Sequence, residues 1–439
     1  MKHLPNTALL GRWLLPAALL WLSGCRNEAP APDAQFEWIF QDKSYINYQS
    51  VDIQPTPDDG YIILATQGPA PYLLRLDSAG RQKWQSDVAA DGLNAYISPA
   101  GQILVRPGGY FFLCQHQASG DIALVKVPEA ASGGRREAVE IRRIRAQDMV
   151  DASAGGCDPG DINNASQFVL SSTYADGSTH LVALGEDINS NVSFTLRTDT
   201  SGVIEWSFCD RYTDLAELGS PGFARNLSFV SYLDLDSECC YVTSSFSGNG
   251  ILTRLIDRNG FEQFSIQPSE GAYLASALFG ESRARDTTDI RLALALHSEE
   301  FIQLLHLSPQ DTAYLSEIDT DFRIRIETDN TSRLFYNLLA SKPVYILPLL
   351  TETAPGFEEQ AVLFGATTQN NQIALQAFQG SGPLESLLLG AGNPYEINAL
   401  RAAPQGGIIV LGTTRVGGLF SRICVFRIPG PAIAALLEP

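Results

Sequence analysis

Leu74-Arg75-Leu76-Asp77-Ser78-Ala79-Gly80-Arg81-Gln82-Lys83-Trp84 is the stretch that decides the fold, because it recurs along the chain. Residues 196–206 repeat it closely, and residues 257–264 repeat its second half. In each copy an Asp is followed by Gly three positions later and by an aromatic residue seven positions later; the sets are Asp77, Gly80 and Trp84, then Asp199, Gly202 and Trp206, then Asp257, Gly260 and Phe264. An Asp carboxylate can cap a type I turn, and Gly adopts the left-handed conformation that follows it. Each copy therefore predicts a β-hairpin.

A second recurring piece lies upstream of these turns. It is an apolar run that ends in small residues, and clear examples are residues 60–66, 241–245, 361–367 and 407–413. Continuous runs of this length, rich in Val, Ile and Tyr, are typical of strands that are buried on both faces.

Together the pieces give a unit of strand A, a Gly-led strand B, strand C, an Asp-x-x-Gly turn and an aromatic strand D. Four antiparallel strands in a unit of about 40 to 70 residues describe one blade of a β-propeller. Turns expected near residues 80, 120, 202, 260, 311 and 382, with a last strand C at 421–428, predict an all-β propeller of about seven four-stranded blades, within a range of six to eight. The predicted domain spans residues 36–430, and residues 128–165 are expected to be an insertion.

The two ends of the domain predict closure of the ring. The last unit has a strand B (408–413) and a strand C (421–428), but Pro429-Gly430-Pro431 follows instead of an aromatic strand D. Residues 36–40, Phe-Glu-Trp-Ile-Phe, form an orphan strand that would complete the last blade and remove an exposed sheet edge. The alternative is that residues 36–40 open an unclosed solenoid. Residues 431–439 are expected to be a C-terminal tail.

These motifs resemble known propeller repeats. The Asp-x-x-Gly-x-x-x-Trp unit is similar to the repeats of quinoprotein-like propellers. The Gly-led strand followed by Leu-Arg-Leu-Asp-x-x-Gly resembles the roughly 55- to 60-residue repeats of secreted and lipid-anchored propeller proteins common in Bacteroidota. The resemblance covers residues 36–430 and implies a fold more than a function.

The N-terminus has the three parts of a secretory signal: a start with Lys2 and Arg12, an apolar run at 14–22, and Leu22-Ser23-Gly24-Cys25. The last four residues resemble the lipobox of bacterial lipoproteins. That resemblance implies a signal peptide at 1–24, a lipidated Cys25, and a Pro-rich tether through residue 35. The alternative of a membrane-spanning anchor fits less well, since the apolar run is shorter than the ~20 residues that a span needs. Arg26 after the cysteine resembles the sorting signal for the outer membrane of Gram-negative bacteria, so the predicted location is the cell envelope.

Charge limits the partners. The chain has 30 basic and 49 acidic residues, a net charge of −19. Such a surface repels nucleic acid, whereas the lipid anchor would hold the chain on a membrane. A protein or glycan ligand is expected, and the oligomeric state is left open.

The vicinal pair Cys239-Cys240 is the most unusual local feature. It resembles the adjacent-cysteine disulfide of quinoprotein alcohol dehydrogenases, which would imply an oxidoreductase with a Ca²⁺ ion held by acidic side chains. The alternative is two buried or separately paired cysteines, with Cys209 as a candidate partner of either one.

Other chemistry-bearing residues form no catalytic pattern. His116, His180, His297 and His306 are scattered, and no Gly-x-Ser-x-Gly motif occurs. Acidic clusters at 234–238 and 319–321 offer weak Ca²⁺ ligands without a Ca²⁺-loop pattern. The sequence therefore predicts no catalytic residues, no defined metal site and no cofactor.

Three functional hypotheses follow. The favoured one is a non-enzymatic binding or scaffold lipoprotein, exposed on the surface or facing the periplasm, whose ligand is unknown. The second is an outer-membrane protein assembly factor, by analogy with lipid-anchored eight-bladed propellers of the β-barrel assembly machinery. The third is a quinoprotein-like oxidoreductase.

Overall fold

The computed structural model describes most of the domain strand by strand. The described residues are 36–40, 45–129, 136–152, 168–174, 181–187, 192–199, 201–211, 230–232, 241–247, 250–256, 260, 262–266, 273–283, 287–296, 301–307, 332–333, 343–351, 360–379, 382–404, 406–417 and 419–437.

The described strands form seven four-stranded antiparallel sheets, which we number in chain order. Sheet 1 contains β2 (Tyr48–Pro55), β3 (Tyr61–Gln67), β4 (Ala70–Leu76) and β5 (Gln82–Gln85). Sheet 2 contains β6 (Tyr96–Arg106), β7 (Gly109–His116), β8 (Ile122–Pro128) and β9 (Val139–Ile144). Sheet 3 contains β10 (Phe168–Tyr174), β11 (Leu181–Asp187), β12 (Val192–Thr198) and β13 (Ile204–Arg211). Sheet 4 contains β14 (Val230–Tyr232), β15 (Tyr241–Ser247), β16 (Gly250–Ile256) and β17 (Glu262–Ile266).

The remaining sheets follow the same plan with one exception. Sheet 5 contains β18 (Tyr273–Arg283), β19 (Thr287–Leu296), β20 (Phe301–Leu307) and β21 (Ser332–Arg333). Sheet 6 contains β22 (Val344–Thr351), β23 (Gln360–Gln369), β24 (Gln372–Gln379) and β25 (Gly382–Leu389). Sheet 7 has the order β1-β28-β27-β26, with β26 (Tyr395–Ala402), β27 (Gly407–Val416), β28 (Phe420–Pro429) and β1 (Phe36–Phe40).

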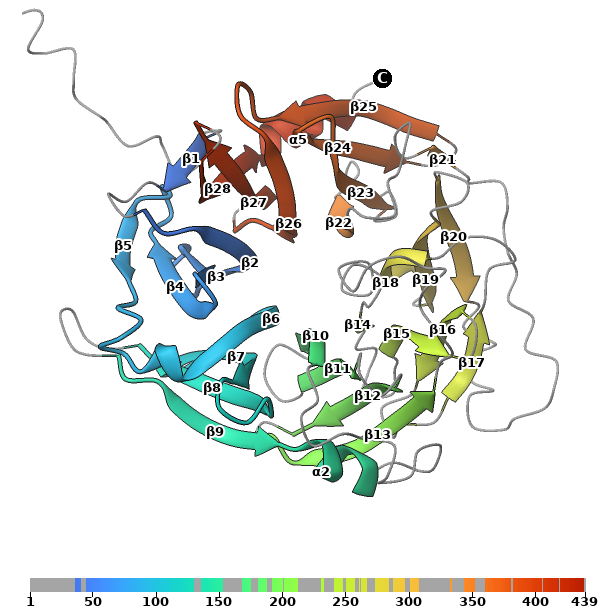
Figure 1. Cartoon of the computed structure of the whole chain (residues 1–439). Coiled ribbons are helices and arrows are strands. Elements are labelled where there is room, and N and C mark those ends of the chain that lie inside the picture. Colours follow the sequence, from blue (N-terminus) through green and yellow to red (C-terminus); the bar gives the residue numbers. More distant parts are fainter. Residues whose placement is uncertain are drawn as a thin grey trace, which may run out of the picture.

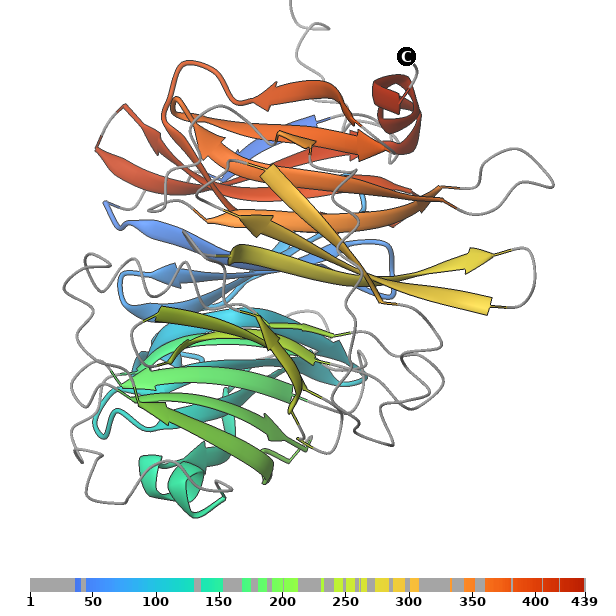
Figure 2. The same cartoon turned by 90° about the vertical axis from the view of Figure 1, so that its right-hand side faces the viewer.

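Strand β1 therefore lies where the sequence predicts, as the outer strand of the last sheet. It runs antiparallel to β28, with Phe36 opposite Arg427 and Phe40 opposite Ile423. The first strands of successive sheets contact one another, from β2 and β6 through to β22 and β26, and β26 also contacts β2. Figure 1 shows these first strands near the centre and the fourth strands toward the rim, and Figure 2 shows the sheets from the side. The arrangement is propeller-like.

The hydrophobic cores lie between neighbouring sheets, as expected when sheets pack face to face. One cluster joins sheets 1 and 2, a second joins sheets 2 and 3, a third joins sheets 7 and 1, and a fourth joins sheets 6 and 7. Strand β1 serves two of them because its side chains alternate between its faces. Trp38 and Phe40 pack against the core between sheets 7 and 1, and Ile39 packs against the core between sheets 6 and 7.

The repeated turns owe their shape to Asp and Gly. The Asp77 carboxylate accepts hydrogen bonds from the backbone N–H groups of Ala79 (3.0 Å) and Arg81 (2.8 Å), and Gly80 has a φ of 77°. The turn at Asp199 is built in the same way, with Gly202 at a φ of 80°. These turns join the third and fourth strands of sheets 1 and 3. Asp257 lies outside the described residues, but Gly260 has a φ of 89° and Phe264 lies in β17 opposite Leu255.

Three expectations differ from the structure. The turn near Gly120 joins the second and third strands of sheet 2, not the third and fourth, because a glycine turn of this kind suits either hairpin. The expected insertion at 128–165 contains β9, the outer strand of sheet 2, and α2 (Ala146–Asp151). Strand β9 is rich in charged residues and only partly buried, so it has no apolar run to reveal it. Within the expected tail, Gly430–Leu437 forms helix α5, whose Ile433 is buried in the core between sheets 6 and 7. The turn expected near residue 311 lies outside the described residues.

The helices are short. Besides α2 and α5, η1 (Leu93–Ala95) is a single turn between sheets 1 and 2. Among the described residues, no helix has the length and apolarity needed to cross a membrane.

Candidate ligand pocket between sheets 7 and 1

Neighbouring sheets make a recurring contact between a turn and an outer strand. Gly260, in the turn of sheet 4, lies so close to Trp206 of β13 that a Cβ there would be 2.6 Å from the indole Cγ. Gly202, in the turn of sheet 3, would place a Cβ 2.5 Å from the Cβ of Arg142 in β9. Only glycine fits at either place, so each turn packs directly on the outer strand of the preceding sheet.

The contact between sheets 7 and 1 is more open. Trp38 of β1 occupies the outer-strand position, and Gly80 belongs to the turn, yet the two line a pocket of about 310 Å³. We call this the seam pocket. Its lining comes from three separate parts of the chain: Trp38, Ile39, Phe40, Tyr48, Tyr72, Leu74, Gly80, Arg81, Gln82, Gln85 and Ile423.

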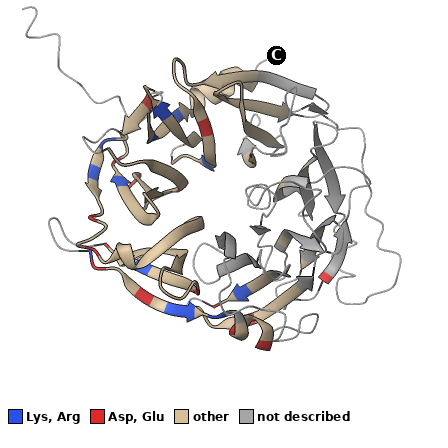
Figure 3. Cartoon of the chain, in the orientation of Figure 1, with Lys and Arg blue, Asp and Glu red and all other residues tan. Residues whose placement is uncertain are grey.

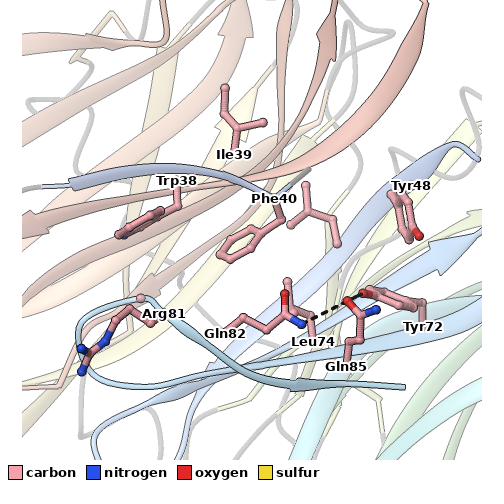
Figure 4. A pocket seen from close by; sticks show the side chains of 11 residues that line it. Trp38, Ile39, Phe40, Tyr48, Tyr72, Leu74, Arg81, Gln82 and Gln85 are labelled. Carbon is pink, nitrogen blue, oxygen red and sulfur yellow. Dashed lines mark hydrogen bonds between the residues drawn. The ribbon is translucent and has the colours of Figure 1, made fainter. Parts of the chain in front are cut away.

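Aromatic side chains supply much of the lining. Trp38 and Phe40 extend from the same face of β1 toward sheet 1 (Figure 4). Tyr48 and Tyr72 lie edge to face, with their ring centroids 5.0 Å apart. The Nε2 of Gln67 donates a hydrogen bond to the Tyr48 hydroxyl at 3.0 Å, which helps to fix that ring.

Amide groups from β5 complete the pocket. The Tyr72 hydroxyl donates a hydrogen bond to Gln85 Oε1 (2.8 Å), and Gln82 Nε2 donates to the same oxygen (3.2 Å). Figure 4 shows these three side chains gathered across the pocket from Phe40. The chain of hydrogen bonds orients both glutamines before any ligand arrives.

The cation in the lining is already paired. Arg81 Nε donates to Asp77 Oδ2 at 2.8 Å, and this pair forms part of the turn that also contains Gly80. The lining contains no carboxylate, imidazole or thiol of its own. Its groups are therefore suited to hold a ligand rather than to transform one.

A second polar cluster lies on the inner strands. The buried carboxylate of Asp52, in β2, bonds Arg401 Nη2 of β26 (2.7 Å), Gln54 Nε2 (2.9 Å) and the backbone N–H of Ile103 in β6 (2.9 Å). Burial raises the pKa of Asp52 above its ordinary value, although these partners each act to lower it. Because the cluster connects sheets 7, 1 and 2, its evident role is to hold the inner strands together.

A buried arginine explains the glycine that leads strand β3. Arg75 donates to the carbonyl oxygen of Tyr61 at 3.1 Å and forms an ion pair with Asp58. A Cβ on Gly60 would lie 2.4 Å from Arg75 Nη1 and from the carbonyl oxygen of Leu76. Burial alone would raise the pKa of Asp58, but hydrogen bonds from Lys83 and Thr56 and the charge of Arg75 hold that pKa well below its usual range.

The other sequence-predicted residues are dispersed. Trp84 lies in β5 beneath the Arg136 guanidinium, which is 4.3 Å from the ring centroid, and close to Tyr110 of sheet 2. His116 ends β7, and His306 lies in β20 opposite Arg291. Cys209 is disulfide-bonded, whereas Cys114 and Cys424 are buried free thiols. Cys25, His180, His297, Cys239-Cys240 and the acidic clusters at 234–238 and 319–321 lie outside the described residues.

Charge and metal ligands do not mark a second site in the described part of the chain. Figure 3 shows basic and acidic residues interspersed over sheets 1, 2 and 7. Within the described ranges, no group of three or more His, Cys, Asp or Glu residues is placed to hold a metal ion.

The seam pocket was missed by the sequence analysis, apart from the importance of residues 36–40. The available signal was the alternation in Phe-Glu-Trp-Ile-Phe, which places Trp38 and Phe40 on one face. Gln82 and Gln85 gave no signal, because polar residues on a short outer strand are ordinary.

Comparisons with known proteins leave the function open. The sequence matches no protein-family model, and no curated protein is significantly similar to it. Among solved structures, an oligogalacturonate lyase in complex with manganese aligns with a TM-score of 0.44 and 10% identity, over 91% of this chain and 98% of that chain. Drosophila Plexin A in complex with Semaphorin 1b gives a TM-score of 0.43 and 10% identity, over 90% and 86% of the two chains.

A third solved structure is a DUF4623 family protein from Bacteroides eggerthii. It aligns with a TM-score of 0.39 and 9% identity, over 73% of this chain and 68% of that chain. Similarities this distant assign neither an activity nor a ligand.

Proposed function

We propose that this chain is a non-enzymatic binding protein, built as a closed seven-bladed β-propeller and held at the cell envelope by a lipid on Cys25. Two observations support the closed ring. Strand β1 pairs with β28, and the first strands contact one another from sheet to sheet, including β26 with β2. With seven blades, the analogy with eight-bladed assembly factors loses its basis, and a role in binding is favoured.

The seam pocket is the observation that carries the binding function. It combines aromatic side chains with amides that are oriented by Tyr72, and it includes no acid, base or nucleophile in its lining. Ligand sites have this general composition, with mostly apolar walls and a few polar groups that fix orientation.

The binding function is tested by comparing wild-type protein with a Gln82→Ala/Gln85→Ala variant. Both glutamines are exposed, so the variant should fold normally. Each detergent-solubilised full-length protein is immobilised and exposed to fractionated envelope proteins and envelope polysaccharides. The proposal requires a fraction that the wild type retains and the variant does not. Equal retention by both proteins would exclude the seam pocket as the binding site.

The lipid anchor is supported by the lipobox and by the short tether before β1. In cells fed labelled palmitate, the wild-type chain should carry the label and sediment with membranes, and Cys25→Ala should do neither. A Cys114→Ala control should behave as wild type, since that thiol is buried in sheet 2. A wild-type chain without label would disprove the anchor and leave the pocket unaffected.

A further inference from the structure

We propose that the seam pocket recognises a neutral saccharide, an inference that rests on the binding function proposed above and names its ligand class. Three properties of the pocket lead to this class: its aromatic surfaces, its unsatisfied amide groups and its lack of net charge.

The aromatic side chains match the apolar faces of a sugar ring. Trp38 and Phe40 project from one face of β1, and Tyr48 and Tyr72 lie across from them in sheet 1. A pyranose carries C–H groups on its faces and hydroxyl groups around its rim. Its faces therefore pack on rigid aromatic rings, which contribute a large contact area at little cost in conformational entropy.

The amides match the rim of hydroxyl groups. Gln85 Oε1 already accepts hydrogen bonds from Tyr72 and Gln82. Among the described residues, Gln85 Nε2 and Gln82 Oε1 have no hydrogen-bond partner, which leaves one donor and one acceptor close together. Each sugar hydroxyl can donate one hydrogen bond and accept others, so two neighbouring hydroxyls would satisfy this pair.

The charges favour a neutral ligand over an acidic one. Arg81 is paired with Asp77 at 2.8 Å, and nearby Lys83 is paired with Asp58 at 2.6 Å. The pocket therefore offers no uncompensated cation to an anionic sugar or a phosphate, and the chain as a whole has a net charge of −19.

The volume fits a small part of a longer ligand. At about 310 Å³ the pocket lies at the lower end of the range for small-molecule sites, enough for about one or two sugar rings. An extended peptide would need a longer groove or a free sheet edge of several residues. Strand β5, the edge of sheet 1 at this seam, is only four residues long.

The test is a binding titration on the full-length protein. It is solubilised in a polyoxyethylene detergent, because glucoside and maltoside detergents are themselves neutral sugars. The probes are neutral gluco-, xylo-, manno- and galacto-oligosaccharides, an oligogalacturonate as the acidic arm, and a mixed peptide library as the peptide arm. Binding is followed by calorimetry and by tryptophan fluorescence, since Trp38 lines the pocket.

At least one neutral oligosaccharide should bind and change the fluorescence, and the oligogalacturonate should bind at least tenfold more weakly. Gln82→Ala and Gln85→Ala should each weaken binding about threefold to tenfold, as expected for the loss of one hydrogen bond. Tyr72→Phe keeps the ring and releases Gln85, so it should weaken binding by a similar factor. Tyr45→Ala removes an exposed aromatic residue outside the pocket and should leave binding unchanged.

The outcomes separate this inference from the proposed function. No binding by any neutral oligosaccharide, or binding that the glutamine variants leave intact, overturns the saccharide inference. If peptides bind and the same variants weaken that binding, the pocket is a binding site for a different ligand class. If the variants are folded by circular dichroism and affect no ligand at all, both proposals fail.

Discussion

Asp52 shows how a single buried side chain can connect three sheets. Its carboxylate bonds Arg401 of sheet 7 and the backbone of Ile103 in sheet 2, while Asp52 itself belongs to sheet 1. Such a group is costly when it loses a partner, because an unpaired charge then remains buried.

Arg401→Met should therefore destabilise the protein by about 3–5 kcal/mol at neutral pH, measured by urea unfolding. The pKa of Asp52 is already raised in the folded state by burial, and loss of Arg401 raises it further. A raised folded-state pKa means that the folded chain binds the proton more tightly than the unfolded chain, whose carboxyl titrates near ~3.9. The deficit should accordingly be largest above the folded-state pKa and should shrink as the pH falls below it. An Asp52→Asn/Arg401→Met double variant should be more stable than Arg401→Met alone at neutral pH; a larger loss in the double variant would contradict this account.

Gly60 and Gly68 provide a matched pair within one sheet. Gly60→Ala would push a methyl group into Arg75 and the backbone of Leu76, at 2.4 Å from each. Gly68 has a φ of 61° and open space around it, so Gly68→Ala meets only backbone strain, about 1–2 kcal/mol. Gly60→Ala should cost more, about 3 kcal/mol or above, since the obstructing atoms include backbone. Equal losses in thermal unfolding would show that Arg75 moves aside freely.

At the scale of elements, β1 separates what sequence could predict from what it could not. The pairing of residues 36–40 with the last sheet was predictable, because an orphan strand at one end matched a missing strand at the other. The outer strand β9 was not, since Val-Glu-Ile-Arg-Arg-Ile has charges on a half-exposed strand instead of an apolar run. The seam pocket was not either: Trp38, Tyr72 and Ile423 are distant in sequence, and only the pairing of β1 with β28 brings them together.

Deletion of residues 36–40 should sharply lower the stability of the protein. It would expose the edge of β28 and remove Trp38, Ile39 and Phe40 from the cores on both sides of sheet 7. We expect a fall in the urea midpoint and more aggregation on heating. Deletion of residues 26–35, the predicted tether, is the control and should leave the midpoint unchanged. A midpoint that survives loss of β1 would disprove closure by this strand.

At the scale of the whole molecule, the cores form a series in which each sheet shares apolar side chains with its neighbours. Sheets 7 and 1 share a core although β1, β26, β27 and β28 come from opposite ends of the chain. Such sharing predicts that distant sheets unfold together.

Cys114 and Cys424 report on this directly, since they lie in sheets 2 and 7. Burial raises the pKa of both thiols, so neither should react with alkylating reagents in the native protein. Site-resolved alkylation across a urea series should show both thiols becoming reactive at the same urea concentration. If Cys424 reacted well before Cys114, sheet 7 would open separately and the shared-core account would be wrong.

The placement of β1 also has a consequence for how the protein matures. The residues that emerge first during synthesis pair with residues 423–427, which emerge almost last. An exported chain that stalls or is clipped near its C-terminus lacks one wall of the seam pocket, however well its other sheets have formed. Ligand capture would thus be confined to chains that have been delivered whole, and a lipid-tethered fragment would be inert.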